Sequence, residues 1–323
     1  MRLLTRLAAL VAVGVVSLAA AGCAGTTPGG ADQFRVVAFT PGYSTPVAKG
    51  TLDSFVEQAK ALGWRVTVVT SDFDYDKLTN EVTAAIAQGA DALFSGLSDY
   101  RQMTPIFTAA RDASIPIFSV DGGVVANDDF ALDVTTDQEQ IAELAVGALE
   151  KAMGGVKGKR VLMIGFDYHP GINARTVKAR KLLEAAGAVI AGGDVKQVIS
   201  PSTAQEESLK FVTDYLQANP HGLDGVWTGW DQAAVGAAQA LSEAGEDTPV
   251  TGVDAVGIAL DAIKKGGPLR ATVMQPWPKV LTVVMDGMKA YAGDRSLPAQ
   301  NFVEVGVTLV DRSNVNDVTP TDQ

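Results

Sequence analysis

The sequence contains a single cysteine, Cys23, among its 323 residues. One cysteine cannot close an internal disulfide, and it is too few to build a zinc cluster. Basic residues are also scarce: 26 lysines and arginines stand against 37 aspartates and glutamates, which gives a net charge of −11, and they form no run. A nucleic-acid surface needs a basic face that replaces phosphate counterions. We therefore expect no nucleic-acid partner, no metal and no cofactor.

Motifs of several common enzyme classes are missing as well. The chain has no Gly-x-Ser-x-Gly nucleophile turn, no phosphate-binding loop ending in Gly-Lys-Ser or Gly-Lys-Thr, and no His-Glu-x-x-His pair. We therefore expect a protein without catalytic activity.

The first residues have the composition of an export signal. Arg2 and Arg6 precede an apolar stretch at 7–21, and small residues lead to Cys23. A cysteine directly after small residues resembles a bacterial lipoprotein signal, in which that cysteine is lipidated and becomes the mature N-terminus. The alternative is an ordinary signal peptide with an incidental cysteine. We expect a location on the outer face of the cytoplasmic membrane or in the periplasm, with residues 23–33 as a flexible tether.

From residue 35 onward the pattern alternates between strand and helix. Short apolar runs that read as strands occur at 35–39, 64–69, 92–95, 115–120, 160–165, 195–199, 225–228, 250–254, 270–274 and 302–310. Stretches with helical spacing separate them, among them 47–62, 104–113, 141–149, 174–186 and 203–218. Repeated β-α-β units predict parallel sheets with right-handed crossovers. Residues 124–136 read as a link, after which the pattern starts again.

Length and repetition favour two similar lobes over one domain. We expect the chain to cross between them near Thr136, Asp254 and Gln275, so that the body can close on a ligand by hinge motion. The predicted segments are a signal peptide at 1–22, the tether at 23–33, an N-terminal lobe at 34–136 plus 276–305, a C-terminal lobe at 137–275 plus 306–314, and a tail at 315–323.

Two of the predicted strands end in an aspartate, Asp121 and Asp254. In open α/β sheets, ligands bind in the crevice outside the carboxyl ends of the strands. Two half-chains that each offer an acidic strand end therefore predict a cleft between the lobes. For Asp121 the alternative is a cap for the turn at Gly122 and Gly123.

Three motifs make a family resemblance specific. His169-Pro170, three residues and then Ala174-Arg175-Thr176 resemble the binding loop of the periplasmic galactose/glucose-binding proteins. The segments at 252–255 and 271–275 are similar to the hinge region of the same family. The chain thus resembles a type I periplasmic sugar-binding protein of the ribose and galactose class, in lipoprotein form. The resemblance implies two Rossmann-like lobes with parallel sheets, a three-strand hinge, a monomer, a sugar or polyol ligand, and an ABC permease with its ATPase as partners.

Hydroxyl chemistry supports the same ligand class. Vicinal hydroxyls can donate in pairs to a carboxylate such as Asp121 or Asp254 and accept in pairs from the guanidinium of Arg175. Arg175 is expected to open a helix, where positive charge is unfavourable, and this favours a ligand role over a solvated arginine. His169 can donate or accept, or it faces water as a loop histidine. Gln275 contacts the sugar in the family; its alternative role is an amide that caps the hinge.

Aromatic residues near strand ends are candidates for stacking on a sugar ring. Trp230 stands where the family commonly has asparagine. Trp277 lies between two prolines, and it either closes the cleft or packs beside the hinge. Tyr43 follows the first strand, with solvent exposure as its alternative. The aromatic clamps of the family correspond to Val47 and Pro201 here, and an acid of its His-Pro loop corresponds to Gly171. We therefore expect Trp230 and Tyr43 to stack on the sugar ring in place of the missing aromatic clamps.

Two other function classes remain open at this point. A signalling receptor would hand the same closed body to a membrane sensor. A glycoside hydrolase would use paired aspartates at a set separation, although Arg175 and the hinge pattern favour holding a ligand over cutting it.

Overall fold

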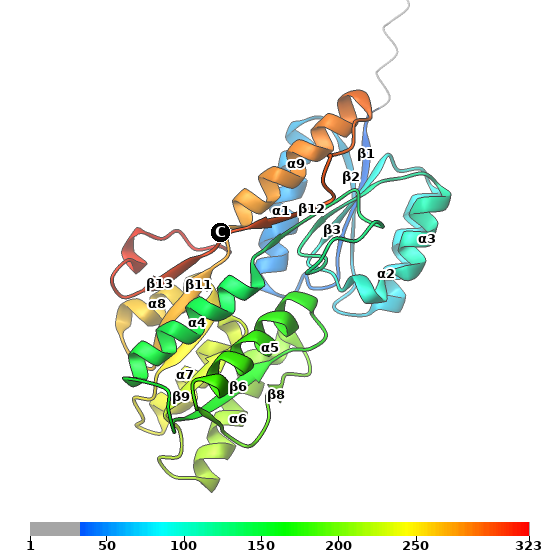
Figure 1. Ribbon diagram of the computed structural model, residues 1–323. Coiled ribbons are helices and arrows are strands. Elements are labelled where there is room, and N and C mark those ends of the chain that lie inside the picture. Colours follow the sequence, from blue (N-terminus) through cyan, green and yellow to red (C-terminus); the bar gives the residue numbers. More distant parts are fainter. Residues whose placement is uncertain (1–32, 323) are drawn as a thin grey trace, which may run out of the picture. The chain divides into compact units, whose positions relative to one another are not determined.

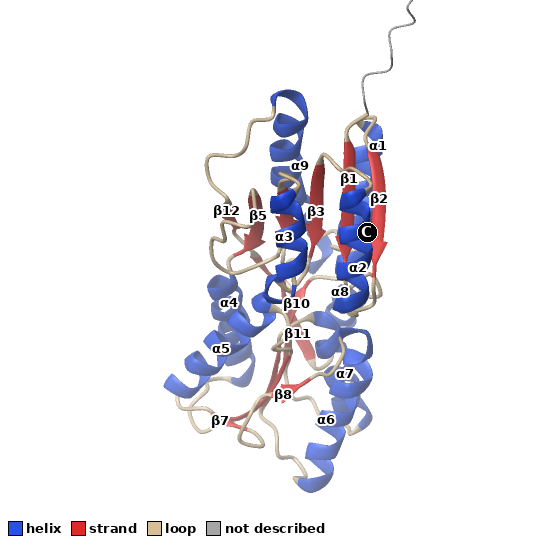
Figure 2. Ribbon diagram, turned by 90° about the vertical axis from the view of Figure 1, so that its right-hand side faces the viewer, coloured by secondary structure: helices blue, strands red, loops and turns tan. Residues whose placement is uncertain are grey.

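The structure is a computed structural model that describes residues 33–322, and it contains two β-sheets with helices on both faces (Figures 1 and 2). The predicted signal peptide, Cys23 and nearly all of the tether lie outside these residues. The predicted fold class, an α/β protein with two Rossmann-like lobes, is confirmed. Within residues 33–322 no helix combines the length and the apolarity that crossing a bilayer requires.

The first lobe is built on a six-stranded parallel sheet with the strand order β12-β5-β4-β3-β1-β2. Its strands are β1 (Arg35–Thr40), β2 (Arg65–Thr70), β3 (Ala92–Gly96), β4 (Ile117–Val120), β5 (Leu132–Thr136) and β12 (Phe302–Val305). Its helices are α1 (Pro46–Ala61), α2 (Tyr75–Ala87), the 3₁₀ turn η1 (Tyr100–Gln102), α3 (Thr104–Asp112) and α9 (Trp277–Asp294). Helices α1 and α9 cover one face of the sheet, and α2 and α3 cover the other.

The second lobe repeats the plan around the order β13-β11-β10-β9-β6-β7, with β8 paired to β6. Its strands are β6 (Arg160–Gly165), β7 (Val189–Ile190), β8 (Lys196–Gln197), β9 (Gly225–Thr228), β10 (Val250–Asp254), β11 (Leu269–Met274) and the antiparallel β13 (Thr308–Asp311). Its helices are α4 (Gln138–Met153), α5 (Pro170–Ala185), the 3₁₀ turn η2 (Pro201–Thr203), α6 (Ala204–Ala218), α7 (Asp231–Glu243) and α8 (Gly257–Lys265). The 3₁₀ turn η3 (Val315–Asp317) follows β13.

Burial explains why these segments form the elements that they do. Along α1 the side chains of Leu52, Phe55 and Ala59 are buried at helical spacing, and the chain leaves the helix through Gly63 at φ +78°. In β1 five of six residues are buried, as expected of a strand that is covered on both faces. The carboxyl ends of the parallel strands in both sheets point toward the region where the lobes meet (Figure 2).

The chain passes between the lobes at three places: between β5 and α4, between β11 and α9, and between β12 and β13. The expected crossing near Asp254 is wrong, because β10 and β11 are neighbours in one sheet and α8 packs against β11 between them. The expected strand at 302–310 is two strands, one in each sheet. The link at 124–136 also contains β5, whose five residues are all buried.

Helix α5 begins at Pro170, four residues before the predicted start. Proline is favoured in the first turn of a helix because its missing N–H would have had no partner there. Arg175 consequently lies in the second turn and does not open the helix, so the argument from the helix dipole does not apply to it.

Candidate functional site

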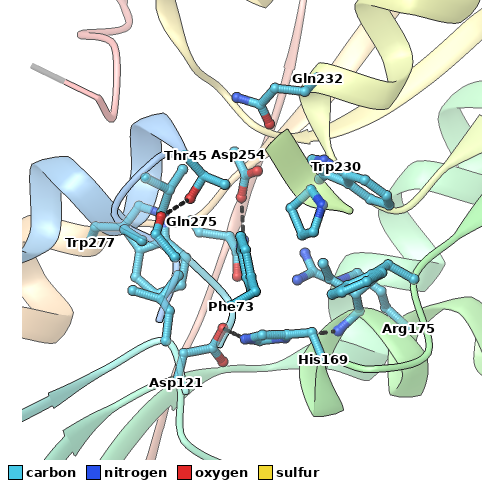
Figure 3. A pocket seen from close by; sticks show the side chains of 17 residues that line it. Thr45, Phe73, Asp121, His169, Arg175, Trp230, Gln232, Asp254, Gln275 and Trp277 are labelled. Carbon is cyan, nitrogen blue, oxygen red and sulfur yellow. Dashed lines mark hydrogen bonds and ion pairs between the residues drawn. The ribbon is translucent and has the colours of Figure 1, made fainter. Parts of the chain in front are cut away.

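A cavity lies where the strand ends of the two lobes meet (Figure 3). Seven of the eight predicted binding residues line it, namely Asp121, His169, Arg175, Trp230, Asp254, Gln275 and Trp277. Asp121 and Trp277 come from the first lobe. His169, Arg175, Trp230 and Asp254 come from the second, and Gln275 stands at a crossing. Residues more than 150 positions apart in the sequence thus share one site.

Asp121 and His169 meet across the two lobes. Asp121 follows β4 directly, is 2% exposed, and accepts a hydrogen bond at Oδ1 from Thr135 Oγ1 (2.5 Å). His169 caps α5, and its Nδ1 accepts from the backbone N–H of Ile172 (3.5 Å). In the neutral ring the proton then belongs on Nε2, which lies 3.6 Å from Asp121 Oδ2 and has no hydrogen-bond partner. Burial lowers the pKa of His169, with Asp121 opposing, so the ring stays a neutral donor.

Arg175 is a buried cation that is only partly satisfied. Its side chain is 2% exposed, its Nε donates to the carbonyl of Gly171 (3.3 Å), and its Nη1 is buried without a partner. Burial lowers the pKa of Arg175, and the charges of Asp254 and Asp121 counteract this effect. Substituting Gly171 would crowd the site, because an added Cβ would lie 3.2 Å from Gln138 Nε2 and 3.4 Å from Asp121 Oδ1.

A chain of hydrogen bonds joins two of the crossings to Asp254. Thr136 Oγ1 donates to Gln275 Oε1 (2.5 Å), and Gln275 Nε2 donates to Asp254 Oδ1 (2.5 Å). Thr321 Oγ1 in turn donates to the backbone carbonyl of Asp254 (2.8 Å). Burial raises the pKa of Asp254 to about 7; Asp121 adds to the rise and Arg175 opposes it. Gln275 therefore caps the hinge and also lines the cavity, so both roles weighed for it are compatible with its position.

Aromatic side chains form much of the remaining wall. Trp230 is 5% exposed, with its ring centroid 6.3 Å from that of Phe166. Trp277 is 3% exposed, and its indole Nε1 is buried without a partner. Phe73 also lines the cavity (Figure 3).

The sequence profile described as a periplasmic binding protein domain matches residues 36–295. The chain belongs to this family. The family predicted from the sequence motifs is thereby confirmed, and it implies an extracytoplasmic location for this periplasmic binding protein.

Individual relatives agree with this assignment. A D-apiose import binding protein of Actinobacillus succinogenes is 26% identical over 302 residues, which are 92% of this chain and 94% of the relative. A xylitol-binding protein of Mycolicibacterium smegmatis is 26% identical over 277 residues, 82% of this chain and 75% of the relative. Among solved structures, an ABC transporter solute binding protein of Agrobacterium vitis with bound allitol superposes with a TM-score of 0.79 at 23% identity, over 88% of this chain and 97% of that one.

Tyr43 is the predicted residue that does not line the cavity of this periplasmic binding protein. Its hydroxyl donates to Asp53 Oδ1 (2.9 Å), and Lys49 Nζ lies 5.3 Å from its ring centroid. Tyr43 is thus held by two side chains of α1, and the expected compensation by Tyr43 stays a prediction. Val47 and Pro201, the positions of the missing clamps, do line the cavity.

Sequence reasoning missed Phe73 and Gln232. Phe73 lies in a loop after β2 with φ +65°, a conformation that is uncommon for a bulky residue and that no sequence pattern announces. Leu97, Asp121 and Asp254 also line the cavity with positive φ. Strained backbone tends to gather at ligand sites. Gln232 could have been found from its place two residues after Trp230, at the crevice end of β9.

Proposed function

We propose that this protein is an extracytoplasmic solute-binding lipoprotein that captures a monosaccharide or related polyol by hinge closure and delivers it to an ABC importer, without catalysis. The observation that carries the proposal is the set of unpaired donors that share one buried cavity with two carboxylates. These donors are His169 Nε2, Arg175 Nη1, Gln232 Nε2 and Trp277 Nε1.

Buried donors without partners are costly, and a ligand that accepts from them removes this cost. A hydroxyl group is suited to the task because it accepts from a donor such as Arg175 and donates its own hydrogen to Asp121 or Asp254. An ammonium group only donates, so it would leave the four donors unpaired. This balance favours a neutral polyhydroxylated ligand over an amine.

The wall of the cavity suits a sugar or polyol. Trp230, Trp277 and Phe73 offer apolar surface to the C–H groups of such a molecule.

Contacts between the lobes support hinge closure. Arg101 in η1 of the first lobe pairs with Asp99 and reaches across through Nη2 to the carbonyl oxygens of Asp167 and Tyr168, at 3.2 Å each. Asp167 and Tyr168 precede α5 in the second lobe. An opening motion would break both bonds, so they contribute to the closed form.

The relatives support the ligand class and the transport role. Their names specify D-apiose import, xylitol binding and, in the Agrobacterium structure, bound allitol, all of them hydroxyl-rich. These names favour import over the signalling receptor and the glycoside hydrolase. Lipid attachment at Cys23 rests on the sequence motif, and detection of a lipidated N-terminal cysteine by mass spectrometry would test it.

A thermal-shift screen of residues 31–323 tests the ligand class. The probes are pentoses, hexoses, polyols, cyclitols and nucleosides, with amino acids and peptides as the opposing set. A ligand at 100 times its Kd stabilises the folded protein by about 2.7 kcal/mol, which raises the melting temperature by several degrees. Stabilisation by amino acids or peptides alone would contradict the proposal.

A pair of arginines on α5 supplies the matched control. Arg175→Met should weaken the binding of any sugar or polyol hit by about tenfold or more, because hydrogen bonds from a charged donor are lost. Arg180 lies on the same helix but pairs at the surface with Glu184 and Asp194. Arg180→Met should therefore bind as the wild type does.

A further inference from the structure

Gln232 is the second residue of α7, two residues after Trp230, and its side chain lines the cavity. Its amide Nε2 is buried and has no hydrogen-bond partner. Gln239 on the same helix differs, because its Nε2 donates to Glu243 Oε1 (2.9 Å) at the surface. Buried amides are normally hydrogen-bonded, so the Nε2 of Gln232 calls for a partner that the described residues do not supply.

Figure 3 shows Gln232 and Asp121 on opposite sides of the cavity, with Asp254 between them. His169 lies beside Asp121, at the far side from Gln232. The polar groups of the cavity thus form two ends: Asp121 with His169 at one, and Gln232 at the other. A ligand that satisfies both ends must reach across the cavity.

We propose that Gln232 is a specificity-determining residue that binds the ligand hydroxyl furthest from Asp121. This inference deepens the proposed function and rests on it. The Nε2 of Gln232 donates to the oxygen of that hydroxyl, and Asp254, which lies between Gln232 and Asp121, is available for the hydrogen of a neighbouring hydroxyl.

The inference has a direct consequence for selectivity. A ligand too short to reach Gln232, or one without a hydroxyl at that end, leaves the amide unpaired and loses one hydrogen bond. Contacts at the Asp121 end are unchanged by this loss. Gln232 therefore discriminates among polyols and sugars by their far end, whereas Arg175, Asp121 and His169 are needed for all of them.

The test measures Kd by titration calorimetry for D-ribose, xylitol, D-apiose and allitol, and for single-deoxy analogues of whichever binds best to the wild type. The variants are Gln232→Met, which keeps the shape and removes the amide, and Gln232→Glu, which keeps the acceptor and removes the donor. Gln239→Met is the matched control on the same helix. Melting temperatures of the ligand-free variants check that each one folds.

Both Gln232 variants should bind the parent ligand about tenfold more weakly than the wild type, and Gln239→Met should not differ from it. For one deoxy analogue, wild type and Gln232→Met should bind equally, because the hydroxyl that Gln232 contacts is absent from both complexes. Unchanged Kd in Gln232→Met, or an equal loss on every analogue, would overturn the inference while leaving the proposed function intact. Failure of the wild type to bind any sugar or polyol would overturn the proposed function itself, and the inference with it.

Discussion

The affinity for a neutral polyol should depend on pH through Asp254. Burial raises the pKa of Asp254 to about 7 in the ligand-free site. The proposed complex uses the ionised carboxylate as a hydrogen-bond acceptor, so protonation competes with the ligand. Because the protonated form predominates below the pKa, binding should weaken as the pH falls from 8 to 6.

The size of the effect follows from the fraction of Asp254 that is ionised. With a pKa of about 7, roughly one part in eleven is ionised at pH 6 and ten parts in eleven at pH 8. If only the ionised form binds, Kd should be about tenfold lower at pH 8, or about 1.4 kcal/mol in binding free energy. Burial lowers the pKa of the His169 ring, which favours its neutral form.

Titration calorimetry at pH 6, 7 and 8 measures this dependence. Repeating the titration at pH 6 in two buffers of different ionisation enthalpy counts the protons released, expected to be about 0.9 for each ligand bound. Asp254→Asn still accepts from Gln275 through its amide oxygen, and it should bind more weakly with a flat pH profile. A Kd that is constant from pH 6 to 8, or tighter binding at pH 6, would refute the role given to Asp254.

Three further predictions concern the wall of the cavity, the contact between lobes and the stability of the fold. Trp230→Ala should abolish sugar or polyol binding, and in the wild type the Trp230 fluorescence should respond to the ligand; normal calorimetric binding by the variant would contradict the stacking role. Arg101→Met should raise Kd a few-fold through faster dissociation in stopped-flow measurements, because two bonds between the lobes are lost. Arg111→Met, which removes an exposed pair with Asp129 inside the first lobe, should leave dissociation unchanged. Finally, the ligand-free protein should melt at a lower temperature at pH 8 than at pH 5. A melting temperature that rises over this range would contradict the raised pKa values of the buried carboxyls. Burial raises the folded-state pKa of several carboxyls, so the stability that they contribute is present below the unfolded pKa near 4 and is lost as the pH rises toward 7. The carboxyls concerned are Asp133, Asp231 and Asp254.

The sequence predicted the strands and the acids at their ends well, because a strand buried on both faces must be a continuous apolar run. Asp121 and Asp254 stand where such runs stop, and the structure brings both into one cavity. Motif resemblance predicts Arg175 and Gln275 as binding residues, because a motif carries information about spatial position that hydrophobic periodicity lacks. Their binding roles remain proposals.

The errors have a common physical origin. Near Asp254 the chain stays in its lobe, because β10 and β11 pair through backbone hydrogen bonds that the sequence does not encode directly. Gly306 and Val307, between β12 and β13, carry no mark that one strand ends and another begins in a different sheet. The hydrogen bond from the Tyr43 hydroxyl to Asp53, ten residues further on, is likewise a contact that no local pattern announces.

By itself, the sequence determined the alternation of strands and helices, the doubling of the unit and the acidic character of two strand ends, because these depend on local periodicity and on the residue that follows each apolar run. Only the tertiary structure decided which polar groups meet and which of their atoms stay unpaired. The unpaired state of His169 Nε2, Arg175 Nη1 and Gln232 Nε2 depends on distances between segments remote in the chain. Local pattern therefore predicts where ligand-binding groups can occur, while the packing of the two lobes selects those that face the same cavity.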